Sequence, residues 1–308
     1  HVYNSTSVAQ REQVFKKSKE EILKIAVDGA KLLKKLADET EGNFAFEYSP
    51  ESFTGTEPEY ALEVCNAVLE VWKPTADRKA IINLPVTVQH SMPHVYAQQI
   101  EYVSKHLKYR ENVLVSLHPH NDRGCGISDA EFGVLAGADR VEGTLFGNGE
   151  RTGNVPLEAM VFEYASLRGT MNGMHPEVIT EIADYIKNET DYDLPPMTPF
   201  VGDNFNLTRA GIHADGMMKN PEIYNIFDTE SILDRPPKVS VTNTSGVAGV
   251  AFWVNQYNKK LGLPAVSKND PVVVKIYSWV CEQYDQGRIT MISDEELEEQ
   301  YKKCSRIE

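Results

Sequence analysis

The sequence predicts an α/β protein in which strand and helix alternate five times, followed by a smaller, mainly helical part. Each of five short apolar runs precedes a longer amphipathic segment. The runs are residues 1–3, 44–48, 80–84, 113–118 and 140–145. Repeated β/α units imply a parallel sheet with right-handed crossovers. Five units are too few to close an eight-stranded barrel of about 250 residues. We expect this α/β part to cover 1–190, with a linker and a small α-rich subdomain over 191–308.

The helices expected in the first part follow the apolar runs. They cover residues 10–40, 57–72, 93–107, 128–136, 157–167 and 176–188. Many lysines occur in the first of them, which predicts a solvated face. The fourth is expected to begin at Ser128, because Ser128 and Glu131 have the spacing of a capping box.

The second part begins with a stretch that cannot continue a helix. Pro195, Pro196 and Pro199 indicate a linker there. Residues 238–253 are expected to form a strand or a turn. Further helices are expected over 270–286 and 294–303.

Composition restricts the possible functions. The formal net charge of −14 over 308 residues argues against a nucleic-acid partner, because nothing offsets phosphate repulsion. No apolar run reaches the roughly 20 residues of a membrane span, and no signal peptide is evident. The four cysteines lack C-x-x-C pairing and are expected to be reduced thiols. These observations predict a cytoplasmic enzyme. Because the chain starts at His1, in what reads as the end of a strand, we expect it to be the interior of a longer protein.

Paired histidines stand at the end of the fourth apolar run. His118 and His120 are two residues apart, so in a strand their side chains point the same way. Neutral imidazoles are common ligands of divalent metals. If 113–118 and 140–145 are neighbouring parallel strands, their C-terminal loops meet, and Asn154 can add an amide oxygen. The alternative is that HPH is a polar strand end and GNGERTGN a flexible surface loop.

Four stretches of the sequence resemble a known enzyme family. They are HVYNSTS at the start, FEYSPESFTGTE at 46–57, HPHND at 118–122 and EGTLFGNGERTGN at 142–154. Together they resemble long-form 2-isopropylmalate synthases, members of a group of metal-dependent barrel enzymes that includes homocitrate and citramalate synthases and hydroxymethylglutaryl-CoA lyase. The resemblance implies that the five units are the last five of a TIM barrel. It also implies that the first three lie upstream and that the family's C-terminal leucine-sensing domain is absent.

The resemblance further implies a reaction. Acetyl-CoA condenses with 2-oxoisovalerate in a Claisen step, and thioester hydrolysis then releases 2-isopropylmalate for leucine biosynthesis. A divalent metal (zinc, manganese or magnesium) and a homodimer are implied as well. The implied metal ligands are His118, His120 and Asn154. The residues implied to line the oxo-acid pocket are His1, Ser49, Asn83 and Thr87. The implied catalytic residues are Glu51, Glu150 and His213, the last entering the partner's site across the dimer.

Simpler roles are open for several of these residues. The alternatives are a helix cap or a bond to Ser52 for Glu51, an ion pair with Arg151 for Glu150, backbone contacts for Asn83 and Thr87, and a structural role for His213.

The sequence departs from the family at one point. The first barrel strand of the family carries an Asp-Gly-x-Arg-Asp type motif, which does not occur here. Without its aspartate and arginine, the ligand set is incomplete and alkoxide charge is uncompensated. We therefore predict that this polypeptide alone is inactive. Two alternatives are open. The chain could belong to a homocitrate synthase, a citramalate synthase or an acyl-CoA lyase of the same group. It could instead be a non-catalytic piece that needs a partner, because an open sheet exposes its edges.

Overall fold

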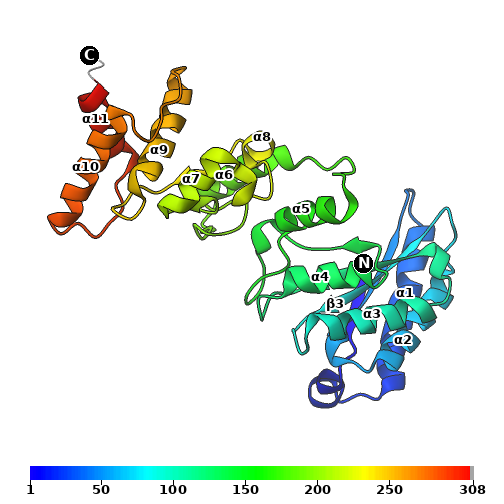
Figure 1. Ribbon diagram of the computed structural model, residues 1–308. Helices are drawn as coiled ribbons and strands as arrows, with labels where there is room; N and C mark the ends of the chain where they lie inside the picture. The colour runs from blue at the N-terminus through cyan, green and yellow to red at the C-terminus, as the bar shows by residue number, and fades with distance from the viewer. Residues whose placement is uncertain (306–308) are drawn as a thin grey trace. The chain divides into compact units, whose positions relative to one another are not determined.

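A five-stranded parallel sheet organises the first of two compact units. The computed structural model describes residues 1–305, and contacts divide the chain between Met174 and His175. The strands are β1 (Val2–Ser5), β2 (Phe46–Glu51), β3 (Ala80–Val86), β4 (Val113–Pro119) and β5 (Arg140–Val141). They pair in sequence order, each parallel to the next. Figure 1 shows the ribbon of this unit with β3 labelled. The predicted α/β class and the five β/α units are confirmed.

The two faces of this sheet differ in polarity. Tyr48, Ile82 and Val115 point to one face, where they are fully buried in an apolar core with residues of the helices. The strand register aligns Asn83 with Ser116 on the opposite, polar face. Strand residues alternate between faces, so every second residue of each strand belongs to the polar face. That alternation sets the positions from which a site can be built.

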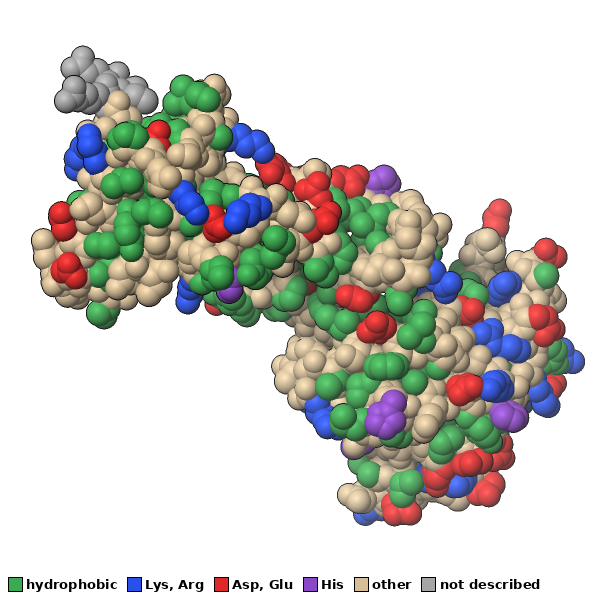
Figure 2. All heavy atoms as spheres, viewed as in Figure 1, with side chains coloured by type: hydrophobic (Ala, Val, Ile, Leu, Met, Phe, Trp, Pro, Cys, Tyr) green, Lys and Arg blue, Asp and Glu red, His purple; other side chains and the backbone are tan. Residues whose placement is uncertain are grey.

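An α-helix follows each of the five strands along the chain. These helices are α1 (Lys19–Asp38), α2 (Pro58–Trp72), α3 (Pro93–His106), α4 (Gly126–Leu135) and α5 (Leu157–Arg168). Buried residues of the first three, such as Ile22, Val68 and Ile100, join the apolar core of the sheet. On the face of this unit seen in Figure 2, acidic and basic side chains are interspersed, as expected for solvated helix surfaces.

The first predicted helix is two segments, so its expected span of 10–40 was wrong. A six-residue π-helix covers Gln10–Phe15 and ends at Lys16, whose φ of +53° lies in the left-handed region. Ser18 then caps α1, because its hydroxyl accepts from the Glu21 amide while the Glu21 carboxylate accepts from the Ser18 amide at 2.8 Å. This capping box marks the true start of the long helix.

The predicted start of α4 was also wrong. The helix begins at Gly126, and Ser128 lies inside its first turn. The Asn121 side chain, five residues upstream, accepts from the Gly126 amide at 2.9 Å. A side chain outside the helix therefore satisfies the first free amide, and no capping box at Ser128 is needed.

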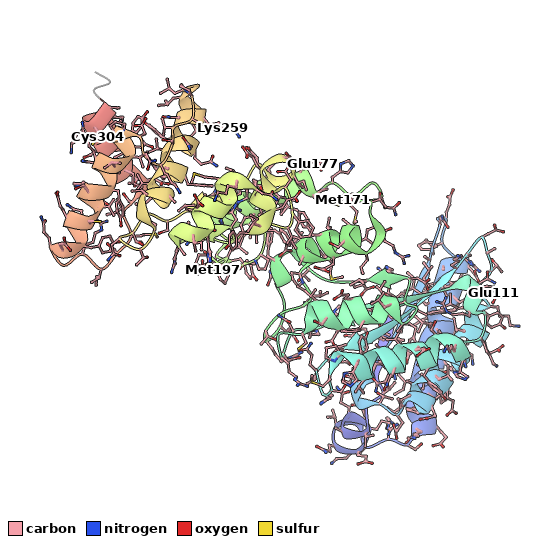
Figure 3. The ribbon with its side chains drawn as sticks, viewed as in Figure 1. Glu111, Met171, Glu177, Met197, Lys259 and Cys304 are labelled. Atoms are coloured by element: carbon pink, nitrogen blue, oxygen red, sulfur yellow. The ribbon has the colours of Figure 1, made fainter. Side chains whose placement is uncertain are left out.

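The second unit is built mainly of helices. Its elements are α6 (Ile179–Glu189), β6 (Leu207–Thr208), α7 (Gly211–Lys219), α8 (Thr229–Leu233), β7 (Lys238–Val239), α9 (Gly246–Leu261), α10 (Pro271–Asp285) and α11 (Asp294–Ser305). Met171 and Glu177, labelled in Figure 3, lie on either side of the division between the units. The helices expected at 270–286 and 294–303 are confirmed.

The expectation of a strand or a turn over 238–253 was right for the first half of that stretch and wrong for the second. Lys238 and Val239 form a strand and Asn243 and Thr244 lie in a turn, but α9 begins at Gly246. Val250 and Val254 of this helix are fully buried in the core of the second unit. An almost unbroken apolar run resembles a buried strand when it is read without its tertiary partners.

Among residues 1–305, no helix is both long enough and apolar enough to cross a membrane.

Candidate active site at the carboxyl end of the sheet

A cavity of about 230 Å³ opens at the carboxyl end of the sheet. Its lining residues are His1, Tyr3, Ser49, Glu51, Asn83, Pro85, Thr87, His118, His120, Glu150 and Arg151. Every predicted site residue lines it except Asn154 and His213. The cavity therefore gathers residues that are distant in the sequence, because parallel strands end at one edge.

The predicted metal ligands lie together. The His118 and His120 rings have centroids 5.6 Å apart. Asn154 forms an isolated β-bridge with His120, and its Oδ1 lies 3.1 Å from Nε2 of His118. Period-two alternation on β4 and the loop after β5 bring these three side chains to one place.

The glycine-rich loop fixes the orientation of Asn154. Gly153 has φ of +86°, and a Cβ there would lie 1.8 Å from the Gly147 carbonyl oxygen. That close approach lets the Asn154 amide donate to the same carbonyl at 3.0 Å. The side-chain Nδ2 of Asn154 donates to the Asn148 carbonyl at 3.2 Å, which leaves Oδ1 facing His118.

These donors fit part of a divalent metal site. A cation with bonds of about 2.1 Å holds neighbouring ligand atoms about 3 Å apart, close to the spacing of His118 Nε2 and Asn154 Oδ1. Nδ1 of His120 is buried and has no partner among the described residues. Burial, with Arg151 and His118 nearby, lowers the pKa of His120 and so favours the neutral imidazole that metals bind. Within residues 1–305, no cluster of three His, Cys, Asp or Glu side chains is placed to hold a metal.

The predicted oxo-acid pocket is a connected polar chain. His1 Nε2 lies 2.8 Å from Ser49 Oγ, and Asn83 Nδ2 donates to the same oxygen at 3.0 Å. Oδ1 of Asn83 is buried and has no partner among the described residues. Thr87 Oγ1 accepts from the Ser52 amide at 2.9 Å, so Thr87 has the simpler backbone role as well as a place in the cavity lining.

The two predicted carboxylates differ in setting. Glu51 accepts a short hydrogen bond from the Ser5 hydroxyl on β1. Glu150 has a side chain that is 88% exposed, and it lies 3.9 Å from the Arg151 guanidinium. Glu51 is therefore held within the sheet, whereas Glu150 stands at the rim.

The sequence analysis did not predict a cluster of charged side chains next to the cavity, formed by Glu47, Arg140 and Glu142. Arg140 donates to Glu142, to Ser116 Oγ at 3.0 Å and to Glu47 at 3.4 Å. Burial and the neighbouring Glu142 raise the pKa of Glu47 to about 7. Burial opposes ionisation of Glu142, but hydrogen bonds from His118, Glu47 and Arg140 outweigh it and lower its pKa to about 2. The alternation of polar residues at 47, 49 and 51 and at 140 and 142 was the available signal.

His213 lies on α7 in the second unit. Its ring packs against Tyr224 with centroids 4.4 Å apart. It does not line the cavity of the first unit, and its catalytic role stays a prediction.

The structure is that of an α/β protein with a polar cavity at the carboxyl ends of parallel strands, where α/β proteins commonly have their active sites. A family model described as HMGL-like matches residues 1–186, and the chain belongs to that family.

The chain is similar to several known proteins. The 2-isopropylmalate synthase of Helicobacter hepaticus is 57% identical over 275 residues, which are 83% of this chain and 48% of that protein. The 2-isopropylmalate synthase of Desulfitobacterium hafniense is 50% identical over 279 residues, 86% of this chain and 50% of that protein. The HMG-CoA lyase of Bacillus subtilis, a solved structure, is 18% identical, with a TM-score of 0.49 over 63% of this chain and 64% of that chain. The chain spans about half the length of the curated relatives it matches.

Proposed function

We propose that this chain supplies part of the active site of a 2-isopropylmalate synthase. The reaction is a Claisen condensation of acetyl-CoA with 2-oxoisovalerate followed by thioester hydrolysis, as in leucine biosynthesis. The observation that carries the proposal is the cavity itself, which collects His1, Ser49, Asn83, His118 and His120 at one strand edge. The relatives at 50% and 57% identity support the choice of reaction.

The proposed cofactor is a divalent cation: zinc, manganese or magnesium. His118, His120 and Asn154 would hold it through imidazole nitrogens and an amide oxygen. When bound, it would polarise the keto group of the oxo acid as a Lewis acid. The incomplete ligand set of these residues supports our expectation that the 308-residue chain alone is inactive.

The remaining residues bind and deprotonate the substrates. His1, Ser49, Asn83 and Thr87 offer hydrogen bonds to the oxo acid from three neighbouring strands. One carboxylate must remove a proton from the methyl group of acetyl-CoA. Of the two candidates, Glu51 has the better-defined position because it accepts a hydrogen bond from Ser5, and this supports Glu51 as the base; Glu150 is largely exposed at the rim of the cavity.

The proposal includes a cytoplasmic homodimer. In it, His213 of one subunit takes part in the site of its partner. The net charge of −14 supports the absence of a nucleic-acid partner.

Release of free thiol from acetyl-CoA tests this function. The 308-residue chain and a version extended upstream of His1 are each assayed with 2-oxoisovalerate, pyruvate and 2-oxoglutarate. We expect release only by the extended version and chiefly with 2-oxoisovalerate. Preference for another oxo acid would favour citramalate or homocitrate synthesis, and His118→Gln in the extended version should abolish release.

A further inference from the structure

The carboxylate of Glu142 is held by three neighbouring strands. It follows β5, and its main-chain amide donates to the Leu117 carbonyl of β4 at 2.7 Å. Arg140 donates to Oε1, and Asn83 Nδ2 donates to Oε2 at 3.3 Å. The side chain is only 19% exposed, so solvent does little to loosen this arrangement.

The same carboxylate faces the ring of His118. Oε2 of Glu142 lies 3.0 Å from Nδ1, and Nε2 on the other side of the ring lies 3.1 Å from Asn154 Oδ1. The guanidinium of Arg140 favours the ionised form of Glu142, which can only accept hydrogen bonds. Nδ1 must then carry the proton, and in a neutral imidazole Nε2 is left with its lone pair.

That lone pair faces another acceptor. Asn154 Oδ1 and an unprotonated Nε2 both present electron density across 3.1 Å, and they attract each other only with a proton or a cation between them. Carboxylate–histidine pairs orient metal-binding imidazoles in this way. We propose that Glu142 is a positioning residue that holds His118 with its proton on Nδ1 and directs Nε2 at a cation shared with Asn154; this rests on the proposed metal site.

The tautomer of His118 is the direct test. The metal-free 308-residue chain is labelled with ¹⁵N-histidine, and the His118 signals are assigned with His118→Gln. We expect the proton on Nδ1 in the unchanged chain and a shift toward Nε2 in Glu142→Gln. Glu47→Gln is the matched control: it removes another carboxylate partner of Arg140, its amide can still donate to Glu142, and Glu47 has no contact with His118 among the hydrogen bonds and ion pairs of the described residues. A proton on Nε2 in the unchanged chain would overturn the proposal.

Zinc affinity, measured by calorimetry with Zn²⁺ alone, is the second readout. Glu142→Gln should weaken binding by about 10–100-fold, as loss of such supporting partners typically does, and Glu47→Gln should not. Equal affinity and an unchanged tautomer in Glu142→Gln would refute the positioning role. If no variant binds zinc but the tautomer shifts as expected, the positioning role stands and the proposed metal site fails. If Glu142→Gln does not fold, the positioning role is tested by the His118 tautomer in Glu142→Asp and in the unchanged chain.

Discussion

Nε of Arg151 donates to Oδ1 of Asp122 at 2.8 Å, and so joins the glycine-rich loop to the loop that follows β4. Another nitrogen of the same guanidinium donates to the Thr87 carbonyl, in the loop after β3. The Arg151 guanidinium also holds the pKa of Asp122 below its usual range. One side chain therefore joins three loops that border the cavity. The position of Asn154 depends on one of them, the glycine-rich loop, being ordered.

Arg151→Gln should loosen this region more than it destabilises the protein. The Arg151 side chain is 41% exposed, so the free energy of unfolding should fall by no more than about 1 kcal/mol. Hydrogen exchange in residues 147–154 should nevertheless become clearly faster. Lys105→Gln, which removes an exposed ion pair with Glu101 on α3, is the control and should leave this loop unchanged. Unaltered protection of 147–154 in Arg151→Gln would show that the backbone alone orders the loop.

Gly153→Ala should damage the site severely. The added Cβ would meet the Gly147 carbonyl at 1.8 Å in a backbone with φ of +86°, so the loop must rearrange. We expect a loss of about 1–3 kcal/mol in unfolding free energy and a loss of zinc affinity. Gly169→Ala is a matched control, since its φ is +68° but its Cβ would meet nothing within 4 Å. It should cost about 1 kcal/mol and leave zinc affinity intact. Unfolding in urea and calorimetry measure the two effects.

The sequence was sufficient to predict the sheet and the meeting of His118, His120 and Asn154. Apolar runs separated by amphipathic helices imply parallel strands, and the period of two places both imidazoles on one face. The contact between His118 and Glu142 was not predictable, because it crosses from one strand to the next and depends on their register. A single sequence carries no signal for that register.

The predictions of helix boundaries were wrong for a related reason. Asn121, outside α4, accepts the hydrogen bond from the first amide of the helix. Ser128 has the capping-box spacing to Glu131 but lies inside the first turn of the helix. In the second unit, burial of Val250 and Val254 decides that α9 is a helix, and the apolar run itself does not reveal it. Tertiary contacts overrode local preference in both cases.

Stability should fall as the pH rises from about 4 to about 6 because of Asp129. Burial raises the pKa of this carboxyl to about 6 from 3.8, although the amide of Gln89 donates to it. Between these values the folded protein binds more protons than the unfolded chain, so unfolding free energy decreases with pH, by at most about 3 kcal/mol. Asp129→Asn keeps an acceptor for Gln89 and removes the charge. We expect it to be more stable at pH 7 and to lose this slope in urea titrations.

Asp77→Asn, at an exposed loop position, is the control for this titration and should keep the slope. An identical pH dependence in Asp129→Asn and the unchanged chain would show that other groups produce it.

Close packing of α4 on β4 predicts strong coupling between Gly133 and Leu117. A Cβ on Gly133 would lie 2.5 Å from Cδ1 of Leu117, which is fully buried next to His118 in the sequence. Gly133→Ala should cost about 1–3 kcal/mol through overpacking, and Leu117→Val about 1 kcal/mol. Because the shorter side chain makes room for the new methyl group, the double variant should be more stable than the sum predicts by about 1 kcal/mol. Pairing Gly133→Ala with Ile22→Val, a buried change on α1, should instead be additive. Additivity in both pairs would mean that the helix shifts away from the strand, and His118 would then be expected to keep its position.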